Sequence, residues 1–167
     1  MNDLERKQAN NKILIIGVDG MDPRFTKRLV DEGKLPNVKK LIERGACRDD
    51  LVLLGANPTI TPPMWATLAT GAYPMTHGIM DYNLSAEDDK DITLGAFSSR
   101  FLKAQPLWNV TAESGKKTLV MHWPGSSWPP SSNSENLFVI DGTNPEGICM
   151  ATGEIEEEYI VIAKNDI

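Results

Sequence analysis

Histidine is scarce in this chain, with only His77 and His122 among its 167 residues. Neither has a neighbouring Asp/His arrangement, so the sequence gives no sign of a Ser-His-Asp type triad. Cysteine is equally rare, because Cys47 and Cys149 are isolated and fit neither a disulfide framework nor a CxxC metal site. This cysteine usage suits a reducing compartment.

Positive charge is also in short supply, because 17 basic residues face 23 acidic ones and the net charge is −6. Such a chain has no general attraction for a nucleic acid polymer or an anionic membrane. No apolar run approaches the ~20 residues of a membrane span, and the N-terminus "MNDLERKQANNK" has no apolar signal core. We therefore expect a soluble, cytoplasmic protein that binds no membrane. A phosphate-bearing substrate would need local positive charge, most economically from a metal ion.

What the chain does contain is the composition of one globular domain, with 41% apolar and 24% charged residues. The apolar run Ile13 to Val18 predicts a buried strand of a parallel sheet. Helical spacing predicts helices within residues 22–33, 35–46, 62–71 and 104–115, and short apolar runs predict strands at 49–55, 116–125 and 137–142. Residues 154–164 fit a helix or a strand. This alternation predicts an α/β fold with a mostly parallel sheet and helices on both faces.

Asp19 follows the first predicted strand and precedes Gly20. Open α/β folds place ligands outside the carboxyl ends of their strands, where this carboxylate would lie. Two structural explanations compete: Asp19 could cap the helix beginning near Pro23, or hydrogen-bond within its own turn. A phosphotransfer aspartate of the DxD type is a third option, weakened because Asp22 stands three residues on and not two.

Thr61 precedes Pro62 and Pro63 at a predicted helix start. As the N-cap, Thr61 would leave Pro62 at the first helical position, where its missing N–H costs nothing. The two prolines remove two N–H donors that a helix start normally offers an anion, so a bound phosphate would need a cation. A threonine hydroxyl is a poor nucleophile without an adjacent base or a metal, and metal activation is the route left. A purely structural cap remains open.

The segments "ILIIGVDGMDP" and "PTITPPMWATLATGAYPMTHGI" resemble the start of the catalytic domain of the alkaline phosphatase superfamily. The closest resemblance is to its type I phosphodiesterase/nucleotide pyrophosphatase branch. The pieces come in the family's order: Asp19, Thr61, Thr70-Gly71, Pro74 and His77-Gly78-Ile79. With "PLWNVTAESGKKTLVMHWPG", the resemblance covers about residues 12–125. It implies an alkaline-phosphatase-like fold, incomplete here, with a polar extension at 1–11, the catalytic-domain portion at 12–167 and a polar loop or insertion at 125–136.

The resemblance also implies a reaction: metal-dependent hydrolysis of a small phosphorylated substrate, of the phosphodiester or nucleotide pyrophosphate type, through a phospho-threonine intermediate. Two divalent metals, usually zinc, act in the family, and Asp19 and Thr61 would bind the same ion. An Asn shortly after the HGI turn holds a phosphoryl oxygen in related enzymes. Here the expected spacing falls on Tyr82, and Asn83, one residue beyond, is the candidate.

Most of the metal-ligand motifs of the family are missing from this chain. The family's other ligands form D-x-x-x-H, D-H and late His motifs, whereas this chain has two histidines and no Asp-His pair. We therefore expect an N-terminal portion of a larger enzyme, inactive by itself, whose site a second chain could complete. The alternative is a catalytically inactive fragment or interaction module that keeps the half-site fold. A sulfatase is disfavoured because no Arg follows Thr61 nearby, and metal-dependent phosphoglycerate mutases usually carry Ser there.

The remaining aromatic and histidine side chains are explained by structural roles. Trp65, Tyr82 and Trp108 could stack a base, but single aromatics at helical or turn positions are more often core residues. His77 fits a structural turn residue better than a metal ligand. His122, with Trp123 beside it, fits loop packing.

Overall fold

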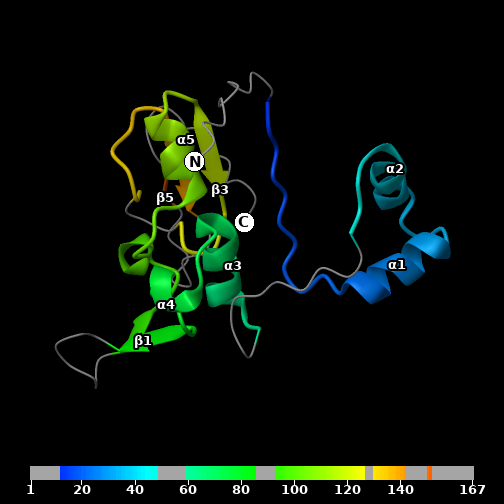
Figure 1. Cartoon of the computed structure of the whole chain (residues 1–167), viewed down its shortest axis with the longest axis horizontal. Helices are drawn as coiled ribbons and strands as arrows, with labels where there is room; N and C mark the ends of the chain where they lie inside the picture. The colour runs from blue at the N-terminus through cyan, green and yellow to red at the C-terminus, as the bar shows by residue number, and fades with distance from the viewer. Residues whose placement is uncertain (1–11, 49–58, 86–92, 127–129, 142–149, 152–167) are drawn as a thin grey trace, which may run out of the picture. The chain divides into compact units, whose positions relative to one another are not determined.

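The computed structural model describes residues 12–48, 59–85, 93–126, 130–141 and 150–151, and it divides the chain into two compact units, 1–51 and 52–167 (Figure 1). The strand predicted at 49–55 and the segment 154–164 lie outside the described residues. Within the described ranges, no helix has the length and apolar character needed to cross a membrane.

The first unit contains two helices, α1 (Pro23–Asp31) and α2 (Pro36–Arg44), as the sequence predicts. The carboxylate of Asp22 accepts a hydrogen bond of 2.7 Å from the N–H of Phe25, which makes Asp22 the N-cap of α1. Each helix starts with a proline, whose missing N–H would have had no partner within the helix. The two helices contact one another.

The strand predicted at Ile13 to Val18 is wrong: residues 12–18 carry no strand, and Ile13 and Leu14 are 79% and 82% exposed. A strand is stabilised by pairing its backbone N–H and C=O groups with a neighbouring strand. The described part of the first unit holds two helices and no second strand that could supply this pairing. The apolar run is therefore left open to solvent.

The second unit begins with α3 (Thr61–Thr70) and the short α4 (Pro74–His77). α3 ends at Gly71 (φ 67°) and α4 ends at Gly78 (φ 83°). These left-handed conformations favour glycine, and they let each glycine N–H reach back to a carbonyl of its helix, at 2.8 Å in both cases. The prediction of a helix at 62–71 is thus confirmed, while α4 was not predicted.

A three-stranded sheet follows, in the order β3-β4-β5. β3 (Thr118–Met121) runs parallel to β4 (Leu137–Asp141), and β5 (Met150–Ala151) pairs antiparallel with β4. α5 (Leu107–Glu113) precedes β3 and packs on β3 and β4 (Figure 1). Helices beside a parallel strand pair confirm the predicted α/β class.

Three further elements of the second unit lie between α4 and α5. β1 (Asn83–Ser85) and β2 (Thr93–Gly95) form an antiparallel hairpin, and the 3-10 helix η1 (Ser99–Phe101) follows it. None of the three was predicted from the sequence. Each has three residues, too few to show a hydrophobic period.

Helix α3 joins the two apolar clusters of this unit. Ala69 packs with buried residues of α5, β3 and β4: Trp108, Ala112, Val120, Leu137 and Val139. Ala66, one turn earlier, packs with Ile79 and Ala96, and with the partly buried Leu84, Phe101 and Leu102. Because α3 is anchored on both clusters, the position of its first turn is well defined within the unit.

Candidate active site

Thr61 is the first residue of α3, and its side chain is half-buried. The N-cap position predicted for Thr61 is wrong by one residue, because Ile60 has the extended backbone of a cap (φ −124°, ψ 159°). Pro62 and Pro63 follow in the first turn, and both are buried. The hydroxyl group therefore lies at the N-terminal end of α3, where the helix dipole favours negative charge.

The phenol of Tyr82 reaches this hydroxyl. Its O–H donates a hydrogen bond of 2.9 Å to Thr61 Oγ1, across 21 positions of sequence. Tyr82 immediately precedes β1, and Asn83 is the exposed first residue of that strand, opposite Gly95. Tyr82, the position on which the family spacing falls, thus contacts Thr61. The role of the neighbouring Asn83 stays a prediction.

Several contacts hold Tyr82 in place. The backbone N–H of Ala96 donates to the carbonyl of Tyr82 at 2.9 Å, at the open end of the β1-β2 hairpin. The N–H of Tyr82 donates to the Asp81 carboxylate at 2.7 Å. Its ring meets the Phe97 ring edge to face, with centroids 6.0 Å apart and planes at 72°. These contacts fix both the backbone and the ring of Tyr82, and they therefore fix the position of its hydroxyl.

His77 is fully buried behind this turn. The N–H of Ile79 donates to His77 Nδ1 at 3.1 Å, so the ring carries its proton on Nε2, which donates to Thr67 Oγ1 at 3.1 Å. Burial lowers the pKa of His77, and backbone hydrogen bonds at Pro63 and at His77 itself partly offset this. Because both ring nitrogens are engaged, the arrangement supports a structural role that ties α4 to α3.

Asp19 lies in the first unit, in an exposed turn with Gly20. Its Oδ1 accepts a hydrogen bond of 3.1 Å from the N–H of Gly20, which has φ 66°. The turn bond expected as one structural explanation is present. The other explanation is wrong, because the cap of α1 is Asp22.

The donor groups of the described residues determine whether these residues could form a metal centre. Within residues 12–48, 59–85, 93–126, 130–141 and 150–151, no group of three or more His, Cys, Asp or Glu side chains is placed to hold an ion. Asp19 and Thr61 would supply one carboxylate and one hydroxyl, whereas a catalytic zinc site takes about three protein ligands. The described residues do not fit a complete metal centre.

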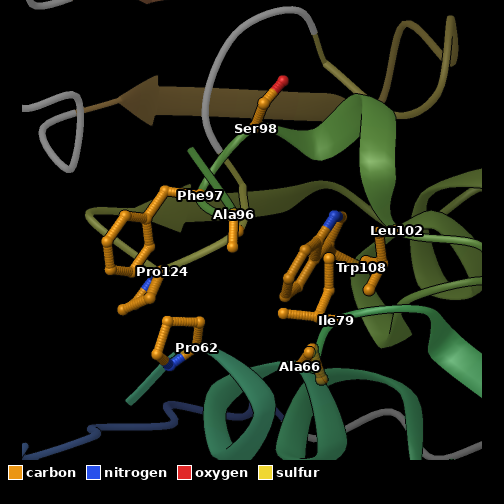
Figure 2. Close-up of a pocket in the computed structure, with 11 residues that line it drawn as sticks. Pro62, Ala66, Ile79, Ala96, Phe97, Ser98, Leu102, Trp108 and Pro124 are labelled. Carbon is orange, nitrogen blue, oxygen red and sulfur yellow. The ribbon is translucent and has the colours of Figure 1, made fainter. Parts of the chain in front are cut away.

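A small apolar cavity lies beside the first turns of α3 (Figure 2). Phe97 and Pro124 lie on one side of it and Ile79 and Trp108 on the other, whereas the hydroxyl of Ser98 points away. Its volume is about 10 Å³, room for about one water molecule. The space is a packing gap and does not accommodate a substrate.

The tryptophans of this region form part of the core. Trp65 and Trp108 are buried, and Trp123 packs edge-on against both, with ring centroids 4.8 and 5.9 Å away. The core interpretation of Trp65 and Trp108 is confirmed, and neither ring offers a face on which a base could stack. Tyr82, in contrast, is 44% exposed.

Fold and site together define an α/β protein that presents a threonine hydroxyl at the start of a helix, hydrogen-bonded to a tyrosine. The chain belongs to the type I phosphodiesterase/nucleotide pyrophosphatase family, whose sequence model matches residues 13–160. The match contains Asp19, Thr61 and Tyr82, and it extends past residue 125, where the sequence resemblance ends.

Similar proteins carry names from the same family. Ectonucleotide pyrophosphatase/phosphodiesterase family member 3 of Rattus norvegicus is 30% identical over 130 residues, covering 75% of this chain and 14% of the relative. The Bos taurus protein of that name is 33% identical over 132 residues, covering 77% and 15%. Venom phosphodiesterase 2 of Crotalus adamanteus is 27% identical over 130 residues, covering 75% and 16%. The chain thus spans about a seventh of the length of these relatives. No solved structure matches it.

Proposed function

We propose that this chain carries part of the active site of a metal-dependent phosphoric ester hydrolase, acting on small phosphodiester or nucleotide pyrophosphate substrates through a phospho-threonine at Thr61. The observation that carries the proposal is the position of Thr61 within the family match, at the positive end of α3. The names of the relatives, phosphodiesterase and nucleotide pyrophosphatase, support the substrate class.

Thr61 is assigned the nucleophilic role. Its Oγ1 forms a bond to phosphorus while the bond to the leaving oxygen breaks, and water then hydrolyses the phospho-threonine and restores the hydroxyl. Asp19 and Thr61 are assigned as ligands of the same divalent ion, which we propose to be zinc. Since the described residues do not complete its coordination shell, the metal dependence is proposed for the assembled enzyme, with further ligands from outside the described residues or from a second chain.

The test compares Thr61→Ala with Thr76→Ala, a matched loss of an exposed threonine hydroxyl on α4. Hydrolysis of bis(p-nitrophenyl) phosphate by the protein in its native assembly should fall at least about 10³-fold in Thr61→Ala and stay unchanged in Thr76→Ala. Acid quenching followed by peptide mass spectrometry should find phosphate on Thr61 of the wild type. Undiminished hydrolysis by Thr61→Ala would remove Thr61 as the nucleophile.

A second candidate function is a non-catalytic interaction module that keeps the half-site fold. It is favoured by the lack of a metal-holding group among the described residues. Metal analysis of the purified chain separates the two. Less than one tightly bound zinc per chain, together with no hydrolysis in any assembly, supports the module, whereas stoichiometric metal with turnover supports the enzyme.

A further inference from the structure

The hydrogen bond from Tyr82 to Thr61 is not needed to hold Tyr82 in place, because other contacts already do so. The ring of Tyr82 already packs on Phe97, and its backbone is already held by Ala96 and Asp81. Tyr82 is 44% exposed, so water could satisfy its hydroxyl without cost. The phenol nevertheless donates to the one oxygen to which nucleophilic attack is assigned.

We propose that Tyr82 is a catalytic residue of this site, donating its O–H first to the Thr61 oxygen and then to a phosphoryl oxygen. This inference rests on the proposed function, because it gives Tyr82 a role in the transfer to Thr61. A donor at 2.9 Å stabilises the negative charge that develops on Oγ1 as the hydroxyl proton leaves to solvent. The dipole of α3, which starts at Thr61, stabilises the same charge.

The hydrogen bond then follows the charge through the reaction. When Oγ1 bonds to phosphorus and the leaving oxygen takes the electron pair of the broken bond, Oγ1 becomes an ester oxygen and a poor acceptor. The phosphoryl oxygens, one bond away, carry the negative charge and attract the same O–H. Tyr82 keeps its own proton throughout, and its bond is strongest where charge accumulates, which raises the rate of the chemical step.

The rigid support of Tyr82 matters to this role. A donor lowers the barrier most when it is already oriented and needs no reorganisation during the reaction. The contact with Phe97 and the hairpin bond from Ala96 provide this orientation before substrate arrives. The phenol spans the distance from the residue before β1 to the start of α3.

The test substitutes Tyr82→Phe, which removes one oxygen and keeps the ring on Phe97. Tyr73→Phe is the matched control, because Tyr73 is an exposed phenol of the same unit. In the native assembly, kcat of Tyr82→Phe should fall about 10- to 100-fold with KM within about 2-fold, at or below the loss typical of an oxyanion donor because Tyr82 is partly exposed. The acidic limb of its pH profile should move to higher pH, whereas Tyr73→Phe should match wild type.

A measurement on the chain by itself checks the hydrogen bond without turnover. The Raman doublet of tyrosine, which reports whether a phenol donates or accepts, should lose a donating component in Tyr82→Phe and weaken in Thr61→Ala. It should be retained in Tyr73→Phe.

The outcomes distinguish this inference from the function on which it rests. If Thr61→Ala abolishes hydrolysis while Tyr82→Phe turns over within 2-fold of wild type, or changes KM alone, the role of Tyr82 is overturned and that of Thr61 stands. If Thr61→Ala remains active, the proposed function itself fails.

Discussion

Acidification should destabilise this protein through one buried side chain, His77. Its neutral ring accepts from Ile79 N–H and donates to Thr67 Oγ1, so the charged form would break the first bond and bury a charge. Burial therefore lowers its pKa below the usual 6.5. The unfolded chain takes up a proton as the pH falls through 6.5, and the folded chain takes one up only at lower pH. Stability from His77 is thus complete above that pH and is lost below it.

The magnitude follows from one proton. Linkage allows a loss of at most about 1.4 kcal/mol per pH unit, and because protonation begins only near pH 6.5, the loss between pH 7.5 and 5.5 is limited to about 1.4 kcal/mol. His77→Gln cannot titrate in this range. It should be less stable at pH 7.5 by roughly 1–3 kcal/mol, because it disturbs buried hydrogen bonds. Its stability should then fall less with acid than that of the wild type.

Urea denaturation at pH 7.5, 6.5 and 5.5 measures both quantities. His122→Gln is the matched control, because His122 is the only other histidine of the chain and is exposed. This control should keep the pH dependence of the wild type, since the carboxylates are common to all three proteins. Equal slopes in wild type and His77→Gln would refute the reasoning.

Three further predictions concern the supports of the site. Gly78→Ala should lower the free energy of unfolding by about 2 kcal/mol and Gly71→Ala by about 1 kcal/mol. Both glycines have positive φ, but only at Gly78 would an added Cβ lie 3.0 Å from the side chain of Lys103. Equal shifts of the urea midpoint in the two variants would contradict the contact with Lys103. Trp123→Leu should cost about 1–3 kcal/mol and weaken the near-ultraviolet circular dichroism, since it removes two edge-on ring contacts; an unchanged spectrum would argue against them. Asp22→Ala should lower the helix content of the first unit and its stability by about 1 kcal/mol, with exposed Asp31→Ala as the control.

Local signals in the sequence predicted the four longer helices, α1, α2, α3 and α5. A proline at the first position and a glycine or polar residue after the last turn bound α1 and α2, and these preferences depend only on the segment itself. Residues 13–18 show the limit of the same method. Their apolar character favours a strand, but pairing depends on partners far along the chain, which composition does not specify.

The candidate site was likewise predictable only where local sequence determines it. The hydroxyl ahead of Pro62 marked Thr61, and the family pattern placed a polar partner near positions 82 and 83. The contact between Tyr82 and Thr61 depends on the turn at Gly78 and on the hairpin β1-β2, whose three-residue strands leave no periodic signal. The cytoplasmic location and the choice of small substrate stay predictions.

The paired prolines after Thr61 shape the unfolded chain as well as the folded one. Each ring fixes φ near −65°, so Pro62 and Pro63 remove conformations that the denatured ensemble would otherwise sample, worth about 0.4–1 kcal/mol for each compatible site. Pro62 also restricts the backbone of Thr61 itself. The proline rings therefore fix part of the orientation of this hydroxyl, which does not depend wholly on packing. A change elsewhere in the core can weaken the unit while leaving the bond directions beside Thr61 almost unaltered.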